Sequence, residues 1–264
     1  MFLKRLMIPF GILAFISLTH AQQASTTAAK DPQAVSILSQ SLNAVGGLSA
    51  ISGIQDYTGT GNITYNWAGD SVPAPVTVRG MGIANFRLDA ALPDGTRTFA
   101  VSGYSGVLIS PDGTRQPTSA YNFFTAGSLN LPYVRLASCL TDATTAISFV
   151  GNVSANGQQV YQVHFATAPL PSVAATGSLQ TLGAFDLYID PASFLVIKLE
   201  ESVYSDSNIG MKLSHEIAYT NYQTSGNIRV PLTVTETVNG RQTWSMTLSS
   251  IAFNSGLAIA EFNP

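Results

Sequence analysis

The sequence contains few charges and almost no cysteine. Only 10% of its 264 residues are charged, and Cys139 is the single cysteine. One cysteine excludes an intrachain disulfide and any metal site built from cysteines. The stretch LASCL places no histidine or lysine beside Cys139, so we expect a buried, small apolar side chain rather than a reactive thiol. Cys139 is also far from the N-terminus, which argues against a lipid-anchored lipoprotein.

Basic residues are also scarce. Twelve Lys and Arg stand against fifteen Asp and Glu, and Lys4 and Arg5 belong to a segment that we expect to be removed. This balance argues against a nucleic-acid partner, which calls for basic clusters. With 45% apolar residues, the chain can bury a large core, and the composition predicts one β-rich domain.

The N-terminus has the pattern of a signal peptide. MFLKRL supplies positive charge, MIPFGILAFISL supplies an apolar stretch, and Thr19-His20-Ala21 offers a cleavage site after Ala21. The apolar stretch is shorter than the ~20 residues that span a bilayer, so an uncleaved anchor is the less favoured alternative. We predict a signal peptide at 1–21, a linker at 22–30 and a single domain at 31–264. The mature protein is expected in the periplasm or outside the cell, without stable membrane insertion.

The chain after the linker predicts one helix followed mostly by strands. Asp31 is a suitable N-cap, Pro32 suits the first helical position, and Gly46-Gly47 ends a segment with helical apolar spacing. Alternating runs separated by Gly, Pro, Asn and Asp predict strands near 57–67, 75–90, 96–110, 145–151, 158–166, 184–205, 211–222 and 228–253. PDGTR occurs at 93–97 and at 111–115, each after an alternating run, and predicts hairpin turns of a meander.

The stretch FDLYIDPASFLVIKLEESVYS, residues 185–205, predicts two strands around an Asp-Pro turn. Pairing Ile189 with Leu195 gathers one apolar face and sets Asp186 opposite Lys198 on the other. The second face still carries Tyr188 and other apolar residues. Such a sheet is typically curved, with a lined hollow and a partly covered back.

The C-terminal hairpin is predicted to turn at Asn239-Gly240. A two-residue loop would place the apolar residues of its strands on opposite faces, because side chains alternate. A three-residue loop with Gly240 in a left-handed bulge pairs Val234 with Trp244 and gathers the apolar residues on one face. We therefore expect the three-residue loop, which also pairs Thr237 with Arg241.

Two segments interrupt the β pattern, at 119–143 and 166–183. The first is too apolar for an exposed loop, and we expect short helices that cover the sheet as a lid. The second is polar and rich in Gly and Ala. The candidate ligand-binding residues combine the lid with the inner face of the sheet: Phe123, Phe124, Leu131, Tyr133, Leu136, Trp244 and Met246.

Motifs for catalysis or metal binding are weak, so no cofactor, no metal and no enzyme activity are expected. His164 and His215 lack metal-ligand spacing and are expected to be structural or exposed. Ser105 lies in Gly103-Tyr104-Ser105-Gly106, which does not have the G-x-S-x-G pattern. Glu200-Glu201 and Glu216 could in principle form a carboxylate pair for glycoside hydrolysis, but a solvated strand edge is favoured.

The order of these features resembles the LolA/LolB-like outer-membrane lipoprotein carrier family. The likeness covers most of residues 31–255: the helix ending in Gly-Gly-Leu, LDAALPDGTR, FDLYIDPASFLVIKLEE, YTNYQTSGNIRVPLTVTETVNG, and a last strand before Phe253-Asn254. The resemblance implies a half-barrel of antiparallel strands with helices in its hollow, which carries acyl chains across the periplasm. The chain is longer than those carriers at 119–143 and 166–183.

The sequence thus predicts a mainly β fold, a curved antiparallel half-barrel with an N-terminal helix and short helical lid segments. The leading functional hypothesis is a secreted or periplasmic protein that binds an apolar small molecule or acyl chain, of which lipid or lipoprotein carriage is one form. The alternative is an envelope structural or interaction protein whose hollow is filled by its own side chains. A hydrolase is third.

Overall fold

The computed structural model describes residues 28–67, 69–103, 105–118, 122, 126–155, 157–167, 183–205 and 208–263. The predicted signal peptide and most of the predicted linker therefore lie outside the described residues, as does most of 166–183. In the described part, no helix has both the length and the apolar character needed to cross a membrane.

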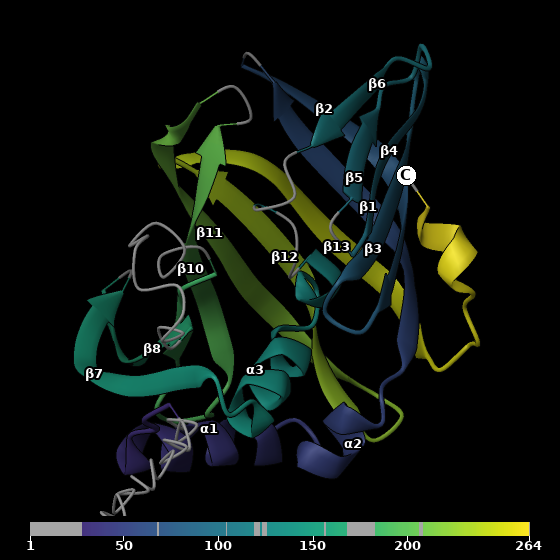
Figure 1. Ribbon diagram of the computed structural model, residues 1–264. Coiled ribbons are helices and arrows are strands. Elements are labelled where there is room, and N and C mark those ends of the chain that lie inside the picture. The colour runs from purple at the N-terminus through teal and green to yellow at the C-terminus, as the bar shows by residue number, and fades with distance from the viewer. Residues whose placement is uncertain are drawn as a thin grey trace, which may run out of the picture.

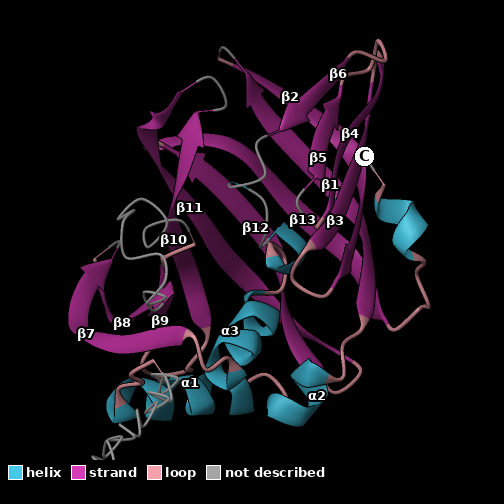
Figure 2. Cartoon of the chain, in the orientation of Figure 1, coloured by secondary structure: helices cyan, strands magenta, loops and turns pink. Residues whose placement is uncertain are grey.

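The described strands form a single antiparallel sheet that curves into an open half-barrel (Figures 1 and 2). Its strand order is β6-β5-β4-β3-β2-β1-β13-β12-β11-β10-β9-β8-β7, so the first and last strands pair at its centre. The strands are β1 Asp56–Trp67, β2 Asp70–Met81, β3 Asn85–Leu92, β4 Gly95–Ser102, β5 Ser105–Ile109, β6 Arg115–Thr118, β7 Thr145–Ala155, β8 Gln158–Thr167, β9 Phe185–Ile189, β10 Val196–Ser205, β11 Asn208–Ser225, β12 Ile228–Val238 and β13 Arg241–Phe253. The predicted mainly β half-barrel is confirmed.

Helices occupy one end of the hollow and part of its interior. They are α1 Pro32–Asn43, α2 Leu48–Ser52, α3 Pro132–Thr141, and the 3-10 helices η2 Ala126–Ser128 and η4 Ile259–Phe262. The curved sheet has two arms, one that ends at β6 and one that ends at β7. Figure 1 shows α1 and α2 below the sheet, while α3 lies between the two arms. The helix η4 contacts the outer side of β3 and β4. The short helical segments predicted within 119–143 correspond to η2 and α3.

The first helix begins where the sequence predicts it. The Asp31 carboxylate accepts hydrogen bonds from the backbone N–H groups of Gln33 and Ala34, at 2.7 and 3.1 Å. Gly46 and Gly47, both at positive φ, follow the helix and allow the chain to turn back. The short helix α2 was not predicted, because five residues are too few to show a helical period.

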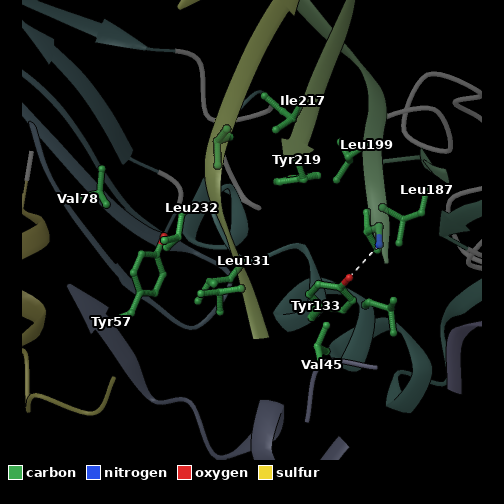
Figure 3. Close-up of a cluster of buried hydrophobic side chains, with 14 of the residues drawn as sticks. Val45, Tyr57, Val78, Leu131, Tyr133, Leu187, Leu199, Ile217, Tyr219 and Leu232 are labelled. Carbon is green, nitrogen blue, oxygen red and sulfur yellow. Dashed lines mark hydrogen bonds between the residues drawn. The ribbon is translucent and has the colours of Figure 1, made fainter. Parts of the chain in front are cut away.

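Alternating residues of the strands build the core inside the hollow. Figure 3 shows Leu187, Leu199, Ile217 and Tyr219 on neighbouring strands, in the same core cluster as Tyr133 of α3. The backbone N–H of Val196 donates to the Tyr133 hydroxyl at 2.8 Å, which fixes the helix against the sheet. Part of the apolar face of the sheet is covered by α3, η2, α1 and α2.

The PDGTR repeats form hairpin turns, as predicted. The first joins β3 to β4 and the second joins β5 to β6. Within the second, the Asp112 carboxylate accepts a hydrogen bond from the Thr114 backbone N–H at 2.9 Å, the local bond for which Asp is favoured in turns.

The predicted register of the 185–205 hairpin is wrong. Ile189 pairs with Val196 instead of Leu195, and a bulge then brings Leu187 opposite Leu199. The turn causes this difference: Phe194 takes positive φ, and the Asp190 backbone N–H donates to the Leu195 carbonyl at 2.9 Å. These two residues close the turn, so the pairing begins one position later.

The expected cross-strand charge pair is absent as a result. Asp186 lies opposite Glu200 rather than Lys198, and its carboxylate contacts His164 Nδ1 at 3.1 Å. Lys198 instead forms ion pairs with Glu200 at 2.9 Å and Glu216 at 3.4 Å. Favourable charge contacts are retained with other partners: Glu200 on the same strand and Glu216 on β11 for Lys198, and His164 on β8 for Asp186.

The predicted three-residue loop of the C-terminal hairpin is also wrong. Val238 pairs with Arg241, which leaves Asn239 and Gly240 as a two-residue loop with φ of 48° and 71°. Positive φ at both positions is the geometry of a type I′ turn, for which Asn-Gly is the preferred sequence. The predicted positive φ of Gly240 is confirmed.

A bulge keeps the apolar residues of this hairpin on one face. Val234 pairs with Met246 and Glu236 with Trp244, after which the register shifts. The shift leaves Thr243 as an extra residue in β13, which reverses the change of face that a two-residue loop causes. The prediction that Val234 and Trp244 share a face is confirmed, although the bulge lies in the strand and not in the loop.

Candidate functional site

A cavity of about 450 Å³ remains inside the half-barrel, beyond α3 and η2. Neither α1 nor α2 contributes to its lining. Most lining side chains are apolar, and they come from both arms of the sheet and from η2. The lining consists of Tyr65, Asn66, Trp67, Phe86, Leu88, Arg97, Phe99, Leu108, Thr118, Asn122, Ala126, Ser128, Leu129, Arg135, Leu199, Glu201, Val203, His215, Ile217, Tyr219, Glu236, Val238, Thr243 and Trp244.

The predicted ligand-binding residues lie at three kinds of position. Trp244 lines the cavity. Four others are buried in the core cluster: Leu131, Tyr133, Leu136 and Met246. Figure 3 shows Leu131 and Tyr133 in this cluster. Phe123 and Phe124 lie outside the described residues. Contact of these seven residues with a ligand stays a prediction.

Charged side chains form a continuous network on the wall of the cavity. Arg135 of α3 donates to the Glu201 carboxylate of β10 at 2.7 Å, and the Arg135 side chain is only 5% exposed. The other carboxylate oxygen of Glu201 is 3.2 Å from His215 Nδ1 on β11. His215 Nε2 is 3.1 Å from Glu236 of β12, and the Thr243 hydroxyl of β13 bonds the Glu236 carboxylate.

Geometry and burial determine the charges in this network. Both ring nitrogens of His215 face carboxylate oxygens, so both must donate, and the ring is an imidazolium. Burial by itself lowers the pKa of His215, but the bonds to Glu201 and Glu236 raise it to about 10. Burial raises the pKa of Glu201, while the charge of Arg135 and the bond to His215 dominate and lower it to about 2. The network therefore contains two cations and two anions.

The Arg135 guanidinium is held by more than its carboxylate partner. It lies 3.6 Å from the centre of the Phe185 ring, and it donates to the Gly183 carbonyl at 3.4 Å. A buried arginine needs such partners, because an unpaired buried charge costs several kcal/mol. The network thus connects α3 to the sheet.

A second arginine faces the cavity from the other arm of the sheet. Arg97 of β4 lies over the rings of Tyr65 and Trp67, at 5.5 and 5.1 Å from their centres. These two rings are themselves stacked, at 4.7 Å and 17°. Burial raises the pKa of Tyr65 to about 12, against the opposing effect of the Arg97 charge. Within the described residues, no carboxylate forms an ion pair with Arg97.

Ser105 and His164 are not brought together, whereas Glu200 and Glu216 are cross-strand partners on β10 and β11. Ser105 begins β5 and His164 lies on β8, toward opposite edges of the sheet. Glu200 and Glu216 bind Lys198 on the outer face. Within the described part of the chain, His, Cys, Asp and Glu side chains form no group of three that could hold a metal ion.

The expectation for Glu201 is wrong, that for His215 holds, and that for Cys139 holds only in part. Glu201 does not lie on a solvated strand edge, because β10 is flanked by β9 and β11 and the Glu201 side chain is 15% exposed. His215 is structural, as expected, but its position in the cavity wall was not foreseen. Cys139, expected to be buried, is only partly buried against the core.

Sequence reasoning overlooked Arg97 and the inward position of Glu201, although the alternation contained a signal for both. Arg97 shares its parity with Phe99 and Val101, and in the same way Glu201 shares its parity with Leu199 and Val203. A charged residue on an otherwise apolar face of a strand points into the hollow. This pattern could have identified both residues before the structure was known.

The fold and cavity define the class: an open antiparallel half-barrel that encloses an apolar hollow. Solved structures share this fold over most of their length. One is a putative outer membrane lipoprotein-sorting protein domain from Vibrio parahaemolyticus, with 14% identity and a TM-score of 0.52, covering 88% of this chain and 96% of that one. A LolA superfamily protein from Nitrosomonas europaea has 13% identity and a TM-score of 0.52, covering 88% and 97%.

A DUF1329 family protein from Desulfovibrio piger is similar to the same extent, with 9% identity and a TM-score of 0.53, covering 87% of this chain and 97% of that one. No family model and no curated protein matches the sequence. The chain therefore has a LolA-like fold, as the sequence resemblance indicated. At these identities the likeness concerns the fold alone.

Proposed function

We propose that this protein binds an apolar or amphipathic molecule, such as an acyl chain, in the cavity inside the half-barrel, beyond α3 and η2. The observation that carries the proposal is the cavity of about 450 Å³ with its largely apolar lining. Small-molecule sites are concave, mostly apolar and about 300–1,000 Å³ in volume. A ligand there would be bound mainly by transfer of its apolar surface out of water.

The proposed role is carriage or storage in the periplasm or outside the cell. Signal-peptide features at 1–21 support export. The lipoprotein-sorting name of the similar Vibrio structure supports an acyl ligand for this fold. The binding role requires no chemical step, and the carboxylates of the described lining, Glu201 and Glu236, are already paired with Arg135 and His215.

Occupation of the cavity can be tested with a neutral apolar dye such as Nile red. Val203 lines the cavity from β10, whereas Val150 of β7 is 53% exposed. Val203→Trp should weaken dye binding, because the larger side chain fills part of the cavity. A loss of about 1.4 kcal/mol of binding energy corresponds to a tenfold weaker affinity, and we expect a loss of at least this size. Val150→Trp, the matched control, should leave dye affinity unchanged. Wild-type affinity in the Val203 variant, or no dye binding to the wild-type protein, would contradict the proposal.

Native mass spectrometry of the purified protein, followed by organic extraction, tests the same proposal without a probe. A copurifying acyl species supports the binder. If the extracts hold none and dye binding also fails, the alternative of a structural protein with a self-filled core is favoured.

A further inference from the structure

Arg97 differs from an ordinary surface arginine in how it is held. Its guanidinium lies over the Tyr65 and Trp67 rings, which are stacked against each other. A guanidinium has five N–H donors, so contact with two rings leaves donors for hydrogen bonds with another group. The rings therefore hold the cation in the lining without neutralising its charge.

The charges of the cavity lining make Arg97 the cation in excess. Arg135 and His215 are balanced by Glu201 and Glu236, with which they form direct contacts. Among the residues that the structure describes, these two glutamates are the carboxylates that line the cavity, and no carboxylate is in ion-pair contact with Arg97. Among the described lining residues, the positive charges then exceed the negative charges by one.

The position of Arg97 suits the head group of an amphiphile. Trp67, which the cation contacts, is 37% exposed, so this part of the lining reaches solvent. Phe99 lies two residues after Arg97 on β4 and also lines the cavity. Phe86 and Leu88 of the neighbouring strand β3 line it as well. A polar group at Arg97 would leave an attached chain beside these apolar side chains.

We propose that the ligand is a single-chain amphiphile with an anionic head group, a carboxylate or a phosphate, which Arg97 binds. The inference rests on the proposed function, because it specifies the chemistry of the molecule in the same cavity. Carboxylate and phosphate both accept paired N–H bonds from one guanidinium. The chain occupies the apolar lining between β3, β4 and η2, and the head group stays near the exposed Trp67.

The test compares ligands that differ only in the head group. Displacement of Nile red is measured for dodecanoate, dodecyl phosphate, 1-dodecanol and dodecyltrimethylammonium, at a pH of about 8 that ionises both acids. The wild-type protein should bind at least one of the two anions about tenfold more tightly than the alcohol, since hydrogen bonds between charged groups are strong. The ammonium compound should bind most weakly. The preferred anion identifies carboxylate or phosphate as the head group.

Variants assign the preference to Arg97. Arg97→Gln should reduce the ratio between anion and alcohol affinity, both measured within that variant, to about twofold or less. Arg97→Glu should reverse the order and favour the ammonium compound. Arg115 is exposed on β6, and Arg115→Gln, which removes the same charge outside the cavity, should keep the wild-type ratio.

The outcomes separate this inference from the proposed function. If Nile red binds and all four compounds displace it equally, the anionic head group is wrong and the apolar binder stands. If Arg97→Gln keeps the wild-type preference, the site is wrong. If neither Nile red nor any of the compounds binds, the proposed function fails, and this inference fails with it.

Discussion

The two arginines of the cavity show two solutions to one physical problem. Arg135 on α3 is 5% exposed and is bound to a carboxylate, a carbonyl and an aromatic ring. Arg97 on β4 is only partly buried and contacts two aromatic rings, and no carboxylate of the described residues forms an ion pair with it. The charge of Arg135 is balanced by a carboxylate of the protein itself. The charge of Arg97 is not balanced in this way and is available to a ligand. A buried cation in a fully paired network indicates a structural role, whereas a cation held by two rings, with no acidic partner among the described residues, suits a ligand.

The largest effect is expected when the paired arginine loses its partner. Glu201→Ala leaves Arg135 and His215 buried with an unbalanced positive charge, which should lower the free energy of unfolding by about 3–5 kcal/mol. Urea unfolding measures this change. The neighbouring Glu200 is more exposed, at 37% of its side chain, and Glu200→Ala should cost about 1 kcal/mol or less. Equal losses in the two variants would show that the network contributes no more than a surface ion pair.

The pH dependence of stability should also identify the network. The pKa of His215 rises from 6.5 to about 10 on folding, so between these values the folded state binds one proton more than the unfolded state. Stability is then fully present below pH 6.5 and falls as the pH rises toward 10, by at most about 1.4 kcal/mol per pH unit. Urea unfolding at pH 7, 8 and 9 measures the slope.

Histidine variants provide the control for this slope. His215→Gln should remove it, while His164→Gln, which changes a side chain that is 40% exposed, should retain it. A His215→Gln protein that keeps the wild-type slope would mean that another group is responsible.

The smallest effect is expected at Arg97. Arg97→Met removes a cation held by two rings, and a partly exposed contact of this kind contributes about 0.5–1 kcal/mol. The methionine side chain can still pack on Tyr65 and Trp67, so the loss in the free energy of unfolding should be below about 1 kcal/mol. Thermal unfolding measures it. A loss as large as that of Glu201→Ala would show that Arg97 has a structural role after all and would remove the contrast between the two arginines.

Local sequence patterns determined most of the fold. The Asp31 cap, the glycines after α1 and the alternating runs predicted the first helix and the strands, because these signals depend on neighbours in the chain. They also determined which side chains face the hollow. The Asn239-Gly240 pair indicated a hairpin, but the loop length was predicted wrongly since the bulge at Thr243 gives no signal in sequence.

The candidate site depended on contacts between residues far apart in the chain, and only the tertiary structure could decide it. Alternation places Glu201 and His215 on the inner face of their strands, yet nothing local shows that Arg135, 66 residues from Glu201, pairs with Glu201. The same holds for Arg97, which meets the Tyr65 ring only because β1 and β4 curve around one hollow. Charge pairing and cavity shape depend on how distant strands and helices lie in space. The sequence by itself therefore determined a β-rich fold with an apolar inner face. The tertiary structure decided which charged side chains on that face are paired.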